Sequence, residues 1–187
     1  MTKRIEIAET EIAGLFSIVR HPIGDNRGYL DRLFCSDELF PLLAGRSVVQ
    51  INHTLTVQAG TVRGMHFQYP PHAETKIVSC LRGQVFDVAV DLRKGSPTFL
   101  RWHGLILSGD DHNSFYIPEG FAHGFQALTN DCEMLYLHTS PYVSGAEGGI
   151  NADDLSVGIV WPKPVTERSK RDIAHPLLSS EFKGITI

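Results

Sequence analysis

The chain has 187 residues, about the size of one domain, and 42% of them are hydrophobic while 20% are charged. This composition is typical of a globular protein and excludes a disordered chain. Its 17 lysines and arginines against 21 aspartates and glutamates give a formal net charge of −4, which argues against a general nucleic-acid-binding protein.

Taken in chain order, the predicted elements are mostly strands. Residues 1–14 alternate charged with apolar side chains and predict an extended arm, and Ser36–Phe40 begins like a short capped helix. Short β-branched or aromatic stretches predict strands at residues 47–55, 76–81, 84–92, 99–107, 113–118 and 132–139. A second short helix is expected near Ser169–Ile173. Because no strand–helix alternation repeats, we expect one all-β domain over residues 1–187.

The segment 84–92 has the clearest pattern. Its side chains alternate so that Phe86, Val88, Val90 and Leu92 form one apolar face, which is typical of an antiparallel sandwich or barrel. No apolar run approaches the roughly 18 residues of a membrane helix, and the first residues lack a signal-peptide core. The sequence therefore predicts a cytoplasmic protein with neither a membrane nor a nucleic acid as its partner.

Polar residues that could carry out chemistry gather first at residues 63–68, with Lys76 following at a distance. On a regular strand, Arg63 would face away from His66 and Gln68. A bulge at Gly64 would bring Arg63 to the same side as the other two. A lone histidine near an arginine could also be a surface feature without function.

A second polar segment, residues 118–125, carries His123 between small residues and could equally be a turn with a core histidine. Together with residues 60–74, this segment resembles the paired motifs of the cupin superfamily. That resemblance implies a cupin-type jelly-roll β-barrel with a few short helices. Gln68 stands where the second metal-binding histidine of the first motif belongs, and glutamine is a poor ligand for zinc or iron, so we expect no metal.

A third group comprises Tyr136, Tyr142 and the pair Arg171-Asp172. Tyr136 shares the alternating face of its predicted strand with His138. A buried tyrosine is more often a packing residue than an acid, so this strand alone does not assign a role.

Read together, these segments resemble the dTDP-4-dehydrorhamnose 3,5-epimerase family of nucleotide-sugar epimerases over nearly the whole chain. The matching motifs, in order, are Asp25-x-Arg27-Gly28, Gln50-x-Asn52, residues 63–68, Lys76, residues 88–93, residues 96–98, residues 118–125, Tyr136, Tyr142, Trp161-Pro162 and Asp172.

The resemblance implies an isomerase that needs no cofactor. It would move protons on the carbons beside the ketone of a nucleoside-diphosphate 4-keto-6-deoxy hexose, at carbon 3, carbon 5 or both. His66 would be the base, Asp172 would orient it, Tyr136 would be the acid, and Lys76 would stabilise the enolate. The substrate-binding residues implied are Arg27 and Arg63 at the diphosphate, and Gln50, Asn52, His123 and Tyr142 around the nucleotide and sugar.

The resemblance also implies a homodimer whose amino-terminal strand is contributed to the neighbouring subunit. One departure concerns the nucleotide: Arg32 stands where the family commonly has a glutamate near the base. Cytidine, or another base, therefore remains an alternative to thymine.

Several alternative functions remain at this point. A single-carbon 3- or 5-epimerase, for example one acting on a CDP-4-keto-dideoxy sugar, would use the same base and acid. A ketoisomerase of the same barrel type is less favoured. A metal-dependent cupin enzyme would use His66, Glu74 and His123 as ligands. A non-catalytic sugar-binding barrel would lose nothing when His66 is replaced.

Overall fold

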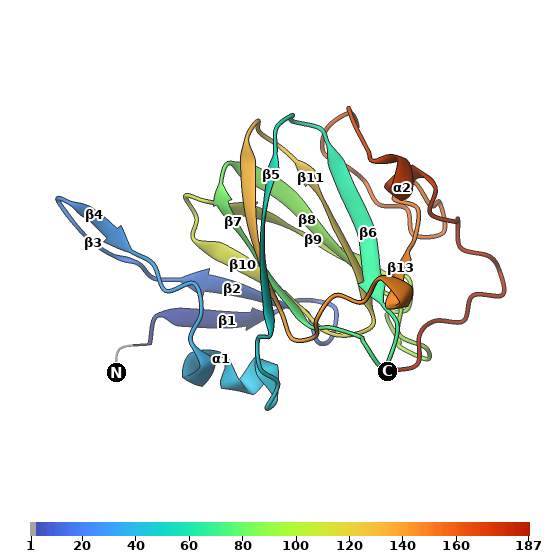
Figure 1. Ribbon diagram of the computed structural model, residues 1–187, viewed down its shortest axis with the longest axis horizontal. Helices are drawn as coiled ribbons and strands as arrows, with labels where there is room; N and C mark the ends of the chain where they lie inside the picture. Colours follow the sequence, from blue (N-terminus) through green and yellow to red (C-terminus); the bar gives the residue numbers. More distant parts are fainter. Residues whose placement is uncertain (1–2) are drawn as a thin grey trace.

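The computed structural model describes residues 3–187 and is built mainly from two antiparallel sheets that face each other (Figure 1). The first sheet has six strands in the order β1-β2-β10-β7-β12-β5, and the second has five in the order β13-β6-β11-β8-β9. A jelly-roll fold of the all-β class is therefore confirmed, with eleven of the described strands in two facing sheets instead of one closed barrel.

The bounds of the six-stranded sheet are β1 Ile5–Glu9, β2 Phe16–Arg20, β10 Asn113–Ile117, β7 Lys76–Arg82, β12 Cys132–His138 and β5 Gln50–Thr56. Those of the five-stranded sheet are β13 Glu147–Gly149, β6 Val62–Gln68, β11 Phe121–Ala127, β8 Gln84–Asp91 and β9 Trp102–Ser108. The six strands predicted from the sequence are all present, with ends that differ by up to three residues.

The apolar core between the sheets includes Val78 and Phe115 from one sheet and Val85 and Phe125 from the other. The alternation in β8 had suggested one apolar face, formed by Phe86, Val88, Val90 and Leu92, yet nearly the whole strand is buried. Its Phe86 face lies under the carboxy-terminal segment, which contributes Trp161 and Phe182 to a second core cluster. Asp87 points into the space between the sheets, where it meets His123.

A local irregularity in β6 decides which of its side chains face the interior. The pairing of β6 with β11 shifts register between His123 and Phe125, opposite residues 63–66. Gly64 has a φ of +123°, and a Cβ there would lie 2.6 Å from the Cα of Gly124. Only glycine allows the two strands to approach each other this closely. The bulge that the sequence suggested at Gly64 is therefore confirmed.

Two short helices and one short 3₁₀ segment, η1 Ser144–Ala146, complete the fold. Helix α1, Ser36–Leu43, begins one residue earlier than predicted, because its N-cap residue is Cys35 and not Ser36. The side chain of Cys35 makes no capping hydrogen bond. Helix α2, Lys170–Ile173, follows Ser169, whose hydroxyl accepts a hydrogen bond from the backbone N–H of Asp172. Within residues 3–187, none of the helices has the length and apolar character needed to cross a membrane.

Strands β3, Ile23–Asp25, and β4, Gly28–Leu30, form a hairpin that projects away from both sheets (Figure 1). All six of its strand residues are exposed. At its tip, Arg27 pairs with Asp25 at 2.6 Å, and its side chain is 86% exposed. A hairpin this exposed has little to stabilise its position within the single chain.

Candidate active site

A pocket of about 280 Å³ lies between the two sheets and receives side chains from both. Strand β6 of one sheet contributes Arg63 and His66, while β7 and β12 of the other contribute Lys76 and Tyr136. The other lining residues are Asn52, Thr54, Phe67, Gln68, Glu74, His123, Gly124, Phe125, His138, Tyr142, Glu147 and Arg171.

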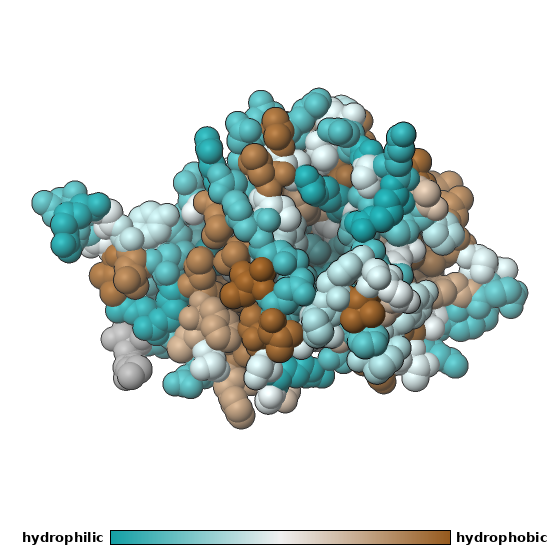
Figure 2. Space-filling model, viewed as in Figure 1, coloured by the Kyte–Doolittle hydropathy of each residue, from teal (hydrophilic) through white to brown (hydrophobic). Residues whose placement is uncertain are grey.

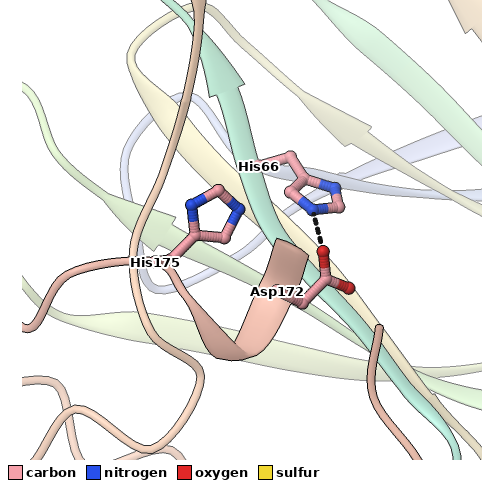
Figure 3. Close-up of side chains that lie close together, drawn as sticks. All are labelled: His66, Asp172 and His175. Atoms are coloured by element: carbon pink, nitrogen blue, oxygen red, sulfur yellow. Dashed lines mark hydrogen bonds and ion pairs between the residues drawn. The ribbon is translucent and has the colours of Figure 1, made fainter. Parts of the chain in front are cut away.

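His66 is paired with Asp172 of helix α2, whose carboxylate lies directly below the imidazole in Figure 3. The Nε2 atom of His66 lies 2.8 Å from Oδ1 of Asp172, and the backbone N–H of Gly64 donates to Oδ2. Burial alone would raise the pKa of Asp172, but the hydrogen bond and charge of His66 outweigh it and hold the pKa at about 2. Because an ionised carboxylate fixes the proton on Nε2, the lone pair of neutral His66 lies on Nδ1.

Tyr136 faces the same pocket from the opposite sheet. Its ring stands edge-on to His123, with centroids 6.1 Å apart, and is stacked against His138. Burial, and then the charge of Asp87, raise the pKa of the Tyr136 phenol well above its ordinary value, while Arg63 acts in the opposite direction. The phenol is therefore protonated at neutral pH and able to donate a proton.

Lys76 extends into the pocket from the first residue of β7. Its ammonium lies 3.1 Å from Glu74, which also accepts a hydrogen bond from Nδ1 of His138 at 2.7 Å. All three side chains are at most 10% exposed. Burial opposes ionisation of Glu74, but His138 and Lys76 overcome that effect and lower its pKa. This network holds the Lys76 ammonium in place in the pocket.

His123 forms a second histidine–aspartate pair, with Nε2 2.8 Å from Oδ1 of the fully buried Asp87. It also pairs in register with His66 across β11 and β6. The three residues that a cupin metal site would require therefore have separate partners. His66 is bound to Asp172, Glu74 to Lys76 and His138, and His123 to Asp87.

Of the predicted binding residues, Asn52, Arg63, His123 and Tyr142 line the pocket. Gln50 lies at its rim, where its amide donates to Asn52 at 3.3 Å and its oxygen accepts from the backbone N–H of Tyr142 at 2.9 Å. The shared face predicted for Tyr136 and His138 is confirmed, since both side chains line the pocket.

Two residues that the resemblance singled out, Arg27 and Arg32, lie outside the pocket. Arg27, at the tip of the projecting hairpin, lines a separate surface hollow, so the single chain does not bring it to His66. Arg32 also lies outside the pocket and is tied to Glu38 of helix α1. The charge reversal noted at Arg32 is therefore balanced within this chain.

Near His66 lie Glu147 and His175, which were not predicted from the sequence, and Arg171, which was named beside Asp172 but given no role. Arg171 lies 3.3 Å from Nε2 of His66 and pairs with Glu147. The ring of His175 stands edge-on to that of His66, with centroids 5.5 Å apart. Asp172 was identified by its motif, but no periodic pattern surrounds the four-residue helix α2, so nothing in the sequence placed its neighbours against β6.

Comparison with known proteins gives a consistent result. A family model described as dTDP-4-dehydrorhamnose 3,5-epimerase matches residues 9–180. The protein of that name from Salmonella typhimurium is 41% identical over 175 residues, which cover 92% of this chain and 94% of that protein.

Solved structures agree with this relationship. An epimerase from Legionella pneumophila in complex with dTDP-4-keto-L-rhamnose is 37% identical, with a TM-score of 0.90, and covers 98% of this chain and 99% of its own. A 3'-monoepimerase from Streptomyces bikiniensis in complex with dTDP-quinovose is 32% identical, with a TM-score of 0.83 and coverages of 90% and 85%.

Proposed function

The chain belongs to the dTDP-4-dehydrorhamnose 3,5-epimerase family, and from this premise we propose that it is an isomerase acting on a dTDP-4-keto-6-deoxy hexose. The reaction inverts carbons 3 and 5 of the sugar. The 4-keto group acidifies the hydrogens on both neighbouring carbons, so inversion requires a base on one side of the ring and an acid on the other.

The observation that carries this proposal is the placement of His66 and Tyr136. They line one pocket but come from opposite sheets, β6 and β12. A sugar ring lying between the sheets would therefore have the imidazole on one face and the phenol on the other.

In the first step, Nδ1 of His66 takes the proton from the carbon beside the ketone. The C–H electrons move into the ring and place a negative charge on the ketone oxygen. Asp172 stabilises the imidazolium that forms, and Lys76 stabilises the enolate oxygen.

In the second step, Tyr136 donates its proton to the opposite face of the same carbon, and the enolate returns to the ketone. The raised pKa of Tyr136 keeps its proton in place until the carbanion forms. Each inversion leaves an imidazolium on His66 and a phenolate on Tyr136. The imidazolium then releases its proton to water and the phenolate takes one from water, which restores both groups before the other carbon reacts.

Substrate binding follows from the remaining pocket residues. Arg63, exposed at the pocket mouth, has a guanidinium suited to the diphosphate. His123 lies deep between the sheets and would contact the sugar. Asn52, Gln50 and Tyr142 form the rim and would contact the nucleotide or the sugar.

We also propose that the protein is a homodimer in which the β3–β4 hairpin of one subunit reaches the pocket of the other. This arrangement would bring Arg27 to the diphosphate, which the single chain does not do. Support comes from exposed apolar side chains along and beside the edge strand β5, namely Val49, Ile51, Leu55 and Val57. Hydrophobic residues gather over this part of the molecule (Figure 2).

Mixing two impaired variants tests the dimer. A dimer that pairs a His66→Ala chain with an Arg27→Ala chain has one complete site and one doubly defective site. Co-refolding equal amounts should therefore restore about a quarter of the wild-type activity, by random pairing of the two chains. Activity no higher than the average of the two separate variants would contradict hairpin exchange.

One second function has a specific observation in its favour. Since a 3'-monoepimerase is 32% identical and shares the fold, inversion of a single carbon would use the same base and acid. Incubation with dTDP-4-keto-6-deoxyglucose in deuterium oxide, followed by NMR, distinguishes the two functions. The proposed function predicts deuterium and inversion at both carbon 3 and carbon 5, and exchange at one carbon alone would establish the monoepimerase. A parallel incubation with the CDP sugar tests the nucleotide, and we expect faster conversion of the dTDP sugar.

A further inference from the structure

Three potential metal ligands gather beside the pocket, on the side of His66 that faces helix α2. Each of His66, Asp172 and His175 offers one ligand atom, and these atoms all lie within 4.8 Å of one another (Figure 3). The proposed proton transfers use His66 and Asp172 but leave His175 without a role.

The fold places His175 at this point by a close backbone contact. Gly149 of β13 pairs in register with His66 of β6. A Cβ at Gly149 would overlap the imidazole of His175, so the ring occupies the space that any larger residue would fill. Among residues 3–187, the buried Nε2 atom of His175 has no hydrogen-bond partner. An imidazole nitrogen held in this way beside a histidine and a carboxylate is available as a ligand.

The ligand types also suit a cation. Two imidazoles and one carboxylate are ligands typical of zinc and other divalent first-row transition ions, with further positions left for water.

We propose that His66, Asp172 and His175 form a binding site for a divalent transition-metal ion such as Zn²⁺, and that the bound ion inhibits the enzyme. This second statement rests on the proposed function. A metal on Nε2 of His66 takes the lone pair of that nitrogen, so the ring proton moves to Nδ1. The nitrogen that would accept the substrate proton is then already protonated. Occupancy therefore removes the base without displacing the residues that bind the substrate.

Arg171 opposes the ion and sets the affinity of the site. Its guanidinium lies 3.3 Å from Nε2 of His66 and 3.6 Å from Oδ1 of Asp172. The side chain is 56% exposed and pairs with Glu147, so it can turn outward when a cation enters. Arg171→Gln should therefore strengthen metal binding.

Isothermal titration of the intact protein with ZnCl₂ tests the site directly. The wild type should bind one ion per chain, and His175→Gln, which keeps most of the side-chain volume, should lower the affinity at least about 10-fold. The matched control is His53→Gln, because His53 is an exposed histidine on β5 that also lies beside a glutamate. The His53→Gln protein should bind Zn²⁺ with the same affinity as the wild type.

A further variant tests the placement of the His175 ring while keeping all three proposed metal ligands. Gly149→Ala should displace the His175 ring and weaken Zn²⁺ binding, with circular dichroism confirming that the fold is retained. The proposal is overturned if the wild type shows no saturable binding, or if His175→Gln and the wild type bind Zn²⁺ equally.

The activity measurement is separate. Zn²⁺ should lower kcat with little change in KM, EDTA should restore it, and the His175→Gln enzyme should need at least about 10-fold more Zn²⁺ for the same inhibition. Binding without inhibition would overturn the inhibitory role. If no sugar substrate were converted, the proposed function would fail, but titration would still decide the metal site.

Discussion

The two walls of the pocket hold their reactive groups in different ways. On the five-stranded sheet, His66 is partly exposed and has an ionised carboxylate, Asp172, at 2.8 Å. On the six-stranded sheet, Tyr136 has aromatic neighbours, His123 and His138, and its pKa is raised by burial and by Asp87. In the proposed mechanism, one wall therefore stabilises a group that gains a proton, while the other holds a group that keeps its proton until the carbanion forms.

This difference teaches how two groups in one pocket acquire opposite roles. A base must carry a positive charge after it acts, and a fixed carboxylate supplies the compensating charge at no cost in reorganisation. An acid must stay protonated until the carbanion forms, which burial near a negative charge ensures. The comparison predicts that variants on the base wall will stop proton removal, whereas variants on the acid wall will stop inversion.

The largest effect is expected from removing the base. His66→Ala should lower turnover by about 10⁴-fold, since general-base catalysis contributes up to that factor. The measurement is steady-state conversion of the 4-keto sugar, with thermal unfolding to confirm that the fold is intact. Turnover near that of an active wild type would show that His66 is not the base. Sugar binding without turnover in either protein would favour the non-catalytic sugar-binding alternative.

Asp172→Asn should have the next largest effect. The amide keeps the contact but neither carries the charge nor fixes the same tautomer, so kcat should fall by about 10²–10³-fold with KM nearly unchanged. A rise in KM alone would mean that Asp172 contributes to binding and not to the function of His66.

A variant at Lys76 tests the contribution of the positive charge that lies between the two sheets. Lys76→Gln removes the positive charge from the enolate and should lower kcat by about 10²-fold, the effect of losing one donor to a developing oxyanion. The matched control is Lys163→Gln, because Lys163 is exposed on the carboxy-terminal segment and its side chain forms no ion pair with the described residues. Equal activity of the two variants would remove Lys76 from the mechanism.

The smallest effect concerns stability. The pKa of Asp172 falls from an ordinary 3.8 to about 2 on folding. A carboxyl whose pKa is lowered in this way stabilises the fold above pH 4 and loses that contribution as pH falls toward 2, by about 2 kcal/mol at most. Urea unfolding across this pH range should show a smaller loss of stability in Asp172→Asn than in the wild type, and parallel curves would contradict the pairing.

Much of this arrangement could be predicted from the sequence. The alternation of β12 correctly placed Tyr136 and His138 on one face, and Gly64 indicated the bulge that turns Arg63 and His66 to the same side. Both are local features, because strand periodicity and glycine conformation depend on a few neighbouring residues.

Other features depend on contacts between distant segments. The pairing of His66 with Asp172 requires helix α2 to lie on β6, and only the folded chain brings these residues, 106 positions apart, together. The inward position of Asp87 was not predicted, because the sequence did not reveal that the carboxy-terminal segment covers the Phe86 face of β8. Arg27 was predicted as a binding residue from its motif alone, and its position outside the pocket follows from the projecting hairpin.

The most direct test of the central claim, an acid and a base on opposite faces of one sugar ring, is the Tyr136→Phe enzyme in deuterium oxide. With the base intact and the acid removed, NMR should show deuterium entering beside the ketone while almost no inverted sugar forms. Inverted product at the wild-type yield would contradict the assignment of Tyr136, and with it the two-walled mechanism.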